Sequence, residues 1–380
     1  MREMTTSAFV LLMSCVLLPV VVSAQTTTPT YRSDGTPATV GVKPTEPAAT
    51  DPKAPITVLP SKMSRWLELQ TGTLATRYRY VESSSGVVSA NQMQYTGQLK
   101  SRVKLDEKGR FTVNALFASG TAFTGGWNTT GVGTGDLIKA WPLKQIFATA
   151  VPTTGVELSF GSIGFTRGES TEITSYDNDG YVTGERASVK RPKSLYFDEL
   201  GVTSAFLGHT SVPAFWDRAN MMRTRNYFQY FASKKVSPTF AASADYTRYL
   251  GVATFRMAGV VKAPKARVFD SVRYEQYFRG GSTPGNGFAV TIDKAVTKKF
   301  SVGAGFANID ANNGTLNADR FAKGNRFFQT TTVKVTPELA FQLFLTESVH
   351  NPYVVSNRFR YEVIASYNVL GRIQRAGHLK

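Results

Sequence analysis

The chain has 380 residues, a formal net charge of +17 and a single cysteine. A lone cysteine excludes a disulfide framework and a cysteine-based metal site. The basic residues form no continuous run but recur singly at alternate positions, so we expect them to line one face of a sheet. This arrangement favours an anionic solute or polymer, or acidic lipid headgroups, and we expect no nucleic-acid partner.

The first 24 residues have the pattern of a secretory signal peptide. Arg2 supplies a positive charge, the run from Ala8 to Val22 is apolar, and small residues lead up to Ala24. The segment is too short and too early for a membrane anchor, so we expect export with cleavage near Ala24. Residues 25–60 are rich in Thr, Pro and Ala, a composition that predicts a disordered linker.

From residue 61 to 370 polar and apolar residues alternate in short segments, which is typical of β-strands. No run of about 20 apolar residues follows the signal peptide, so no transmembrane helix is expected. We predict 16 strands, or 14 if the two segments around Asp177–Gly180 are not strands. The predicted segments are 66–81, 92–105, 110–119, 155–165, 171–176, 181–190, 194–207, 226–236, 239–250, 252–262, 266–279, 287–296, 299–310, 325–335, 338–349 and 357–369.

The connections differ in length on the two sides of the predicted sheet. Very short turns at 106–109, 236–238, 296–298 and 336–337 all fall on the side that holds the termini. The longer connections, on the other side, are Thr121–Pro152, His209–Arg225, Asp310–Lys323 and one near Asn351. Within the first, Leu137–Ala150 could form a short helix, fold inward as a constriction, or be an ordinary surface loop.

Short turns on one side and long loops on the other are typical of an outer-membrane β-barrel. An unpaired backbone group in lipid costs several kcal/mol, so an open sheet edge is excluded and the sheet must close. The 25 Phe and 16 Tyr are spread along the chain, which suits an outer wall with aromatic girdles. The predicted fold class is therefore all-β, a closed antiparallel transmembrane β-barrel.

Alternation assigns the two faces of the predicted strands. In 357–369 the aromatic and aliphatic residues share one side, and the charged residues share the other. A lipid-facing charge near the midplane costs about 2–4 kcal/mol, so the charged sides should face the lumen. The predicted pore-lining, anion-binding residues are Arg77, Arg79, Lys100, Arg102, Arg256, Arg273 and Arg360, with Glu275 and Glu362 interspersed. These arginines could select anions, pair with lumen acids to brace the wall, or do both.

No motif indicates catalysis or a bound metal. Asp177–Gly180 has oxygen ligands close together, but a calcium loop needs a glutamate at its twelfth position, where Ser188 stands. An Asp-Gly hairpin turn is the better interpretation. The three histidines have no metal-ligand spacing. We therefore expect no enzyme activity, no cofactor and no metal.

The alternating strands, signal peptide and basic interior resemble a bacterial outer-membrane porin, and more loosely a barrel of the alginate-export type. The pieces that carry the resemblance are Thr73–Tyr80 and Phe359–Glu362, within a similarity over 61–370. The resemblance implies a passive channel in the outer membrane of a diderm bacterium, surrounded by outer-membrane lipid and compatible with a homotrimer. One departure is the tail at 371–380, because such barrels usually end in an aromatic residue.

Three other interpretations stay open on the sequence alone. The barrel could export an acidic polysaccharide. It could instead be a structural or ligand-binding barrel without channel activity, plugged by Thr121–Pro152. A soluble, secreted β-sandwich is the third, although a charged face on nearly every strand argues against it, because a sandwich buries its inner face.

Overall fold

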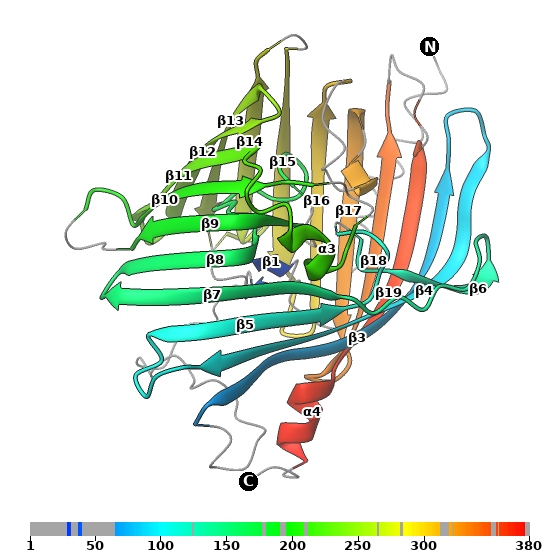
Figure 1. Ribbon diagram of the computed structural model, residues 1–380. Helices are drawn as coiled ribbons and strands as arrows, with labels where there is room; N and C mark the ends of the chain where they lie inside the picture. Colours follow the sequence, from blue (N-terminus) through cyan, green and yellow to red (C-terminus); the bar gives the residue numbers. More distant parts are fainter. Residues whose placement is uncertain are drawn as a thin grey trace.

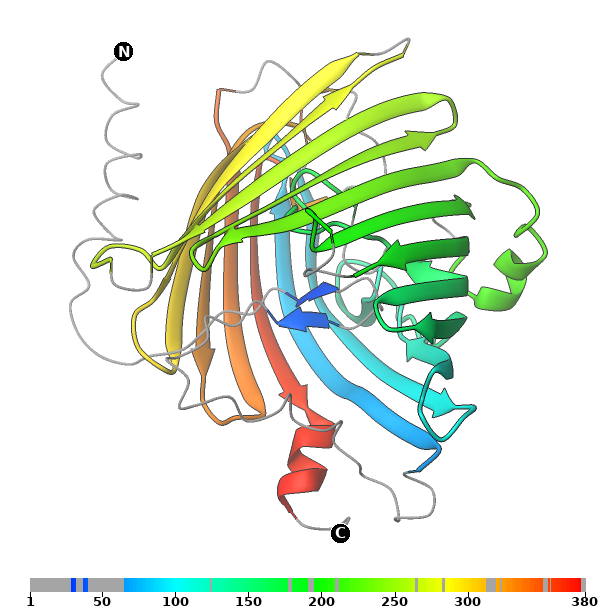
Figure 2. The same ribbon diagram turned by 90° about the vertical axis from the view of Figure 1, so that its left-hand side faces the viewer.

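The computed structural model describes residues 29–31, 37–39 and 65–376, except 124, 177–179, 191–194, 209–211, 264–265, 282–283, 312–318, 322, 351–354 and 356. Within this part of the chain, 16 antiparallel strands close into a barrel (Figures 1 and 2). The strands are β3 (Leu67–Glu82), β4 (Val88–Lys104), β5 (Phe111–Ala118), β7 (Leu143–Thr153), β8 (Val156–Gly164), β9 (Tyr181–Val189), β10 (Glu199–Phe206), β11 (Tyr227–Ser237), β12 (Phe240–Tyr249), β13 (Val252–Lys262), β14 (Ser271–Arg279), β15 (Gly285–Ala295), β16 (Phe300–Ile309), β17 (Gly324–Lys334), β18 (Leu339–Ser348) and β19 (Phe359–Asn368).

The barrel closes where its last strand meets its first. β19 pairs antiparallel with β3 from Phe359 opposite Glu82 to Asn368 opposite Thr73. Closure leaves no strand of the ring with an unpaired edge, as the hydrocarbon of a membrane requires. A short extra strand, β6 (Asn128–Gly133), pairs with β4 beyond the end of β5. The predicted all-β, closed, antiparallel barrel is confirmed.

The predicted strand number is right, but two of the assignments behind it are wrong. Residues 171–176 are not a strand, because they belong to a loop between β8 and β9. β7 is a strand, although it lies where a long loop was expected. Polar/apolar alternation misses β7 because its inner face carries Phe147, which is buried in an apolar cluster with Phe123 instead of facing water. The two errors cancel in the count.

All four predicted short turns join neighbouring strands at the end of the barrel that holds its first and last residues. They connect β4 to β5, β11 to β12, β15 to β16, and β17 to β18. The opposite end is less uniform than predicted. There β12 and β13 are joined by Leu250 and Gly251 alone, both with positive φ, at 48° and 83°. Long loops therefore cover only part of that rim.

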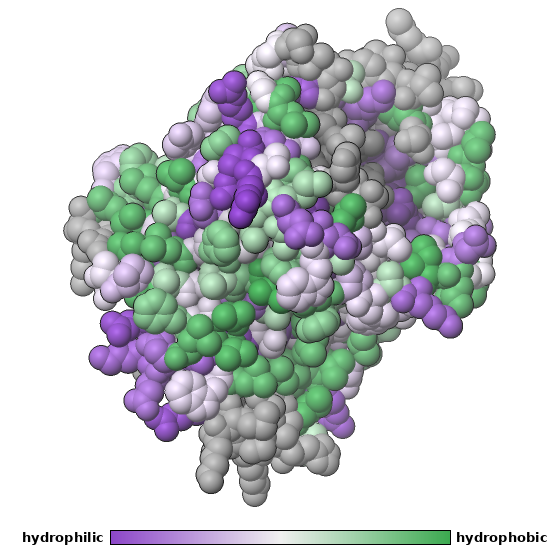
Figure 3. All heavy atoms as spheres, viewed as in Figure 1, coloured by the Kyte–Doolittle hydropathy of each residue, from purple (hydrophilic) through white to green (hydrophobic). Residues whose placement is uncertain are grey.

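The outer wall is apolar, as the alternation predicts. Leu74 is 51% exposed and Val363 is 44% exposed, whereas Glu362, the residue before Val363 on β19, is fully buried. Apolar residues cover much of the middle of the face shown in Figure 3. An aromatic row crosses the outside of β14–β17, with ring centroids 5.0–6.5 Å apart. Its members are Tyr274, Phe288, Phe306 and Phe327.

In the described part of the chain, three short helices lie before or after wall strands. α3 (Phe215–Ala219) follows β10, and the 3-10 helix η1 (Asp319–Phe321) precedes β17. α4 (Val369–Arg375) follows β19, and Asn368 caps it by accepting the Gly371 N–H at 2.9 Å. No helix among the described residues is long and apolar enough to cross a membrane.

α4 is fastened to the seam between the last and first strands. Leu370 is buried over Gly72 of β3, where an added Cβ would lie only 2.8 Å from the Leu370 Cγ. The predicted tail at 371–380 therefore begins as a helix. The predicted signal peptide and most of the predicted linker lie outside the described residues and stay predictions. Within residues 25–60, β1 (Pro29–Tyr31) and β2 (Pro37–Thr39) pair antiparallel.

Candidate functional site

The interior of the barrel is occupied by the loop between β8 and β9, whose described residues are 165–176 and 180; we call these residues the inward loop. Most of its described residues are buried. The Thr171 N–H and the Thr174 hydroxyl both donate to the Glu275 Oε2, at 2.8 and 2.6 Å. Glu275 lies on β14, separated from β9 by four strands of the ring. These contacts require the loop to cross the lumen.

The wall formed by β11–β14 holds the inward loop along its length. The Gln229 amide donates to the Thr166 carbonyl at 2.7 Å, and the Ser243 hydroxyl accepts the Glu169 N–H at 2.7 Å. The Arg256 Nε donates to the Thr174 carbonyl at 3.2 Å. A buried loop must satisfy its backbone polar groups from its surroundings, and polar side chains of the wall do this here.

On β19, the Glu362 carboxylate gathers three guanidinium groups, which we call the arginine cluster. Arg77 of β3 lies 2.8 Å from it, Arg360 of β19 lies 2.7 Å away, and Arg320 of η1 lies 2.9 Å away. Arg320 also reaches Glu172 of the inward loop, at 3.5 Å. The cluster therefore joins the first strand, the last strand, a rim loop and the inward loop.

Positive charge exceeds negative charge around the arginine cluster. Arg79 follows Arg77 on the same face of β3, and Arg326 of β17 contributes to the positive field at Arg360. Among the described residues, three guanidiniums pair with the carboxylates of Glu172 and Glu362, and Arg79 and Arg326 add two more positive charges beside them. The described side chains at this place therefore carry three more positive than negative charges, five minus two.

A second segment, whose described residues are 119–123 and 125–127, also enters the barrel. The Lys144 ammonium donates to the carbonyl oxygens of Ala122 and Gly125, at 3.1 and 2.8 Å. Phe123 is fully buried, and the Arg218 guanidinium of α3 lies 4.6 Å from its ring. Burial lowers the pKa of Arg218. The part of Thr121–Pro152 that enters is thus its beginning, whereas residues 137–142 run beside β6, where the Ile138 N–H donates to the Thr129 carbonyl at 3.0 Å.

The nine residues predicted to line the pore occupy inward-facing positions but do not form one site. Arg77, Arg360 and Glu362 meet in the arginine cluster. Arg256 and Glu275 anchor the inward loop.

Of the other four predicted residues, Arg79 lies beside the arginine cluster and the remaining three lie elsewhere on the wall. Arg79 and Arg273 are half-buried, on β3 and β14, and Lys100 is buried on β4. Arg102 lies towards the short turns, 3.0 Å from the Asn114 side chain.

Sequence reasoning missed Arg320, Glu172 and the wall residue Asp245, which lies 3.1 Å from Arg256. Arg320 lies in a connection where no periodicity assigns a direction to its side chain, and Glu172 lies in 171–176, which was wrongly predicted to be a strand. Alternation along β12 could have placed Asp245 inward. Among the described residues, no group of three or more His, Cys, Asp or Glu could hold a metal ion. Asp177, Asn178 and Asp179 lie outside the described residues.

Solved structures show the same architecture. A doubly substituted mutant of Rh. blastica porin has a TM-score of 0.50 at 11% identity, covering 80% of this chain and 99% of that one. Salmonella typhi OmpF in complex with daunomycin has a TM-score of 0.51 at 10% identity, covering 79% and 97%. A structure described as "Asymmetric conductivity of engineered proteins" has a TM-score of 0.51 at 12% identity, covering 80% and 99%.

At these identities the likeness concerns the fold alone. The chain has the 16-stranded barrel of bacterial porins, so the architecture implied by the sequence resemblance is confirmed. No protein-family model matches the sequence, and no curated protein matches it. Nothing in these comparisons points to the alginate-export type.

Proposed function

We propose that the protein is a passive outer-membrane channel that favours small anions. The observation that carries the proposal is the excess of guanidinium groups over carboxylates among the described residues at the level of the inward loop. The porin fold supports a channel, and the apolar wall supports a location in the outer membrane. The predicted signal peptide fits this location, and a homotrimer stays a prediction.

The excess charge would act on a solute through its electrostatic potential. One charge that is about 6 Å from a solute in water contributes about 0.7 kcal/mol, or roughly a threefold change in an equilibrium constant. Low-dielectric walls strengthen this effect, and salt weakens it. Small anions therefore enter more easily than small cations and diffuse down their gradient without a covalent step.

The two segments that enter the barrel set the size of the solute. The inward loop crosses the lumen from β8 to β14, and residues 119–123 and 125–127 fill space beside β7. Both are fixed by hydrogen bonds to wall side chains, so we expect a narrow and permanent constriction. Large polymers are poor candidates for passage through such a bore.

Conductance across a planar bilayer under a KCl gradient tests the proposal. The reversal potential should show chloride preference, and Arg79→Gln should lower the chloride-to-potassium permeability ratio about threefold, as expected for one charge. Arg110→Gln is the matched control, because Arg110 lies in the turn between β4 and β5. Cation preference, or an equal effect of both substitutions, would contradict anion selection by the lumen.

A plugged barrel is the second candidate, and a specific observation favours it. Two buried apolar clusters lie inside the ring of strands, one around Phe123 and Tyr181 and the other around Phe321 and Phe344. A water-filled lumen does not need such clusters, whereas a plug does. This candidate predicts no conductance from the native protein and new conductance after Phe123→Ala loosens residues 119–127.

A further inference from the structure

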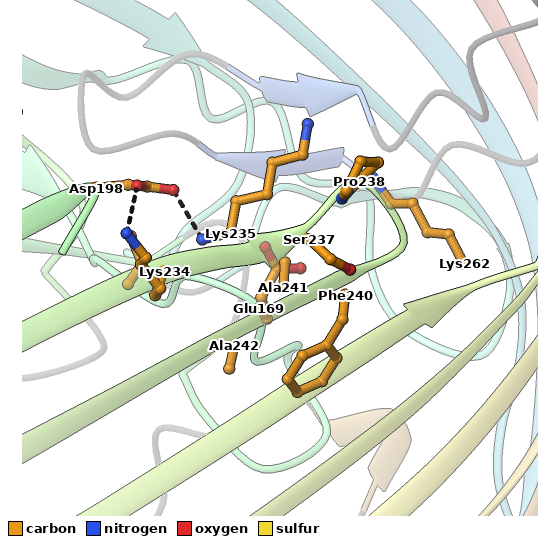
Figure 4. A pocket seen from close by; sticks show the side chains of 11 residues that line it. Glu169, Asp198, Lys234, Lys235, Ser237, Pro238, Phe240, Ala241, Ala242 and Lys262 are labelled. Atoms are coloured by element: carbon orange, nitrogen blue, oxygen red, sulfur yellow. Dashed lines mark hydrogen bonds and ion pairs between the residues drawn. The ribbon is translucent and has the colours of Figure 1, made fainter. Parts of the chain in front are cut away.

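A cavity of about 180 Å³ lies on the turn side of the inward loop, against the ends of β11, β12 and β13. Its lining includes Lys235, Lys262 and Glu169, which Figure 4 shows around the turn at Pro238. Such a cavity has room for several water molecules, and thus for a solute of amino-acid size. The wall beneath it also supplies the hydroxyls of Ser233 and Ser237.

Several other lysines at this end of the barrel form ion pairs. Lys294 lies 2.8 Å from Asp270, Lys190 lies 3.1 Å from Glu157, and Lys104 pairs with Glu68. By contrast, the ammonium groups of Lys235 and Lys262 make no ion pair or side-chain hydrogen bond with the described residues. Two positive charges are therefore available in one concave place.

Glu169 adds a single negative charge to the same cavity. Its backbone N–H is fixed by the Ser243 hydroxyl at 2.7 Å, which sets where the residue leaves the inward loop. Within the described part of the chain its carboxylate forms no ion pair. Asp198 and Lys234 also line the cavity, but they lie 3.7 Å apart and pair with each other. Beyond that pair the cavity offers two cationic groups and one anionic group, and none of the three neutralises another.

The backbone places the lysines so that one ligand can meet both. Lys235 of β11 is opposite Ala241 of β12, which is opposite Val260 of β13, two residues before Lys262. One strand separates the two lysines, so their main chains are roughly 10 Å apart across the sheet. Two flexible four-carbon side chains can close this gap around a small ligand. Figure 4 shows them extending from opposite sides of the turn.

We propose that this cavity binds a small α-amino dicarboxylate. The ligand has two carboxylates for the two lysines and one ammonium for Glu169, so its charges complement those of the cavity. A plain dicarboxylate would leave Glu169 facing like charge, and a neutral amino acid would leave one lysine without a partner. The inference deepens the proposed function and rests on it in one respect, since the solute must enter the lumen.

Binding to the folded full-length barrel in detergent, measured by isothermal titration calorimetry, tests this site. The probes are L-glutamate, glutarate, which lacks the ammonium, and L-glutamine, which lacks one carboxylate. We expect L-glutamate to bind about tenfold more tightly than either, because each missing group removes one charge-assisted hydrogen bond. Heat-modifiable gel mobility establishes that each variant is folded.

Three variants and a control show which side chains bind L-glutamate. Lys235→Gln and Lys262→Gln should each weaken L-glutamate binding about tenfold, while Glu169→Gln should remove its advantage over glutarate. Lys299→Gln is the control, because Lys299 is exposed in the turn between β15 and β16. Equal affinity of the native protein for L-glutamate and glutarate would overturn the proposal, as would lysine variants that bind like the control.

Bilayer conductance separates the two proposals. A native protein that conducts chloride but does not bind L-glutamate would overturn the cavity while leaving the channel. A protein that binds L-glutamate and does not conduct would retain the cavity and overturn the channel.

Discussion

Replacing Glu362 with glutamine should destabilise the barrel and increase its preference for anions. Glutamine keeps the size of the side chain but removes the charge that three guanidiniums share at 2.7–2.9 Å. Glu362 and Arg360 are fully buried, and Arg77 is 5% exposed, so water cannot replace the lost carboxylate. The variant would leave positive charges in contact with one another in a buried place.

The size of the effect follows from the burial of the partners. Removing one member of a buried ion pair typically costs about 3–5 kcal/mol. The three contacts share one carboxylate and are not additive. Arg320 contributes less than the others because its side chain is 20% exposed and it keeps Glu172 at 3.5 Å. We therefore expect a loss of about 3–5 kcal/mol in the free energy of unfolding, rather than a multiple of it.

Urea unfolding of the barrel in lipid vesicles, followed by gel mobility without heating, measures this loss. Arg320→Gln is the matched control, since it leaves Glu362 with Arg77 and Arg360, and it should cost less than about 2 kcal/mol. In a bilayer, Glu362→Gln should raise the chloride-to-potassium permeability ratio about threefold. A Glu362→Gln barrel that is as stable as the control would refute the conclusion that this carboxylate stabilises the barrel through its three guanidinium partners.

Three further substitutions test other parts of the molecule. Glu275→Ala removes the acceptor of two hydrogen bonds from the inward loop, at 2.6 and 2.8 Å. The single-channel current should therefore become larger and noisier, and an unchanged current would contradict the anchoring role of Glu275. Leu250→Asn should stabilise the barrel to urea by about 1 kcal/mol, because leucine is strained at its φ of 48° and asparagine tolerates this region. The Phe111 N–H and Arg110 hold the pKa of Asp106 below its ordinary 3.8. The stability that the Asp106 carboxylate contributes to the barrel is present at neutral pH and is lost as pH falls through its folded-state pKa. The Asp106→Asn barrel should therefore lose less stability to urea than the native barrel when the pH is lowered from neutral to below about 3.8.

The wall of the barrel could be predicted because its pattern depends on residues that are close together in the sequence. Each residue of a strand faces either lipid or lumen, so Val363 and Glu362, adjacent in sequence, report opposite sides of the wall. Short turns such as the one after Lys104 and the one after Lys334 fix the direction of neighbouring strands. Alternation and turn length therefore sufficed for the fold class and for most strand positions.

The interior could not be predicted because its contacts join residues that are far apart in the chain. Glu275 holds Thr171 from 104 residues away, and Arg320 reaches Glu362 across 42 residues. The segment 171–176 is rich in the β-branched and aromatic residues that favour strands, yet Ile173 packs in an apolar cluster and the Thr171 N–H donates to the wall. A loop folded into a polar lumen thus imitates the composition of the wall.

The structure separates two roles that the sequence left together for the lumen arginines. Arg77, Arg256 and Arg360 are buried against carboxylates, so their charges mainly hold the barrel and its inward loop in place. Arg79 and Arg273 are half-buried and lie on the same inner face. Because a solute senses accessible charge most strongly, substitutions at these two should change selectivity more than stability. Substitutions at the three buried arginines should do the opposite, and a reversal of this order would contradict the division.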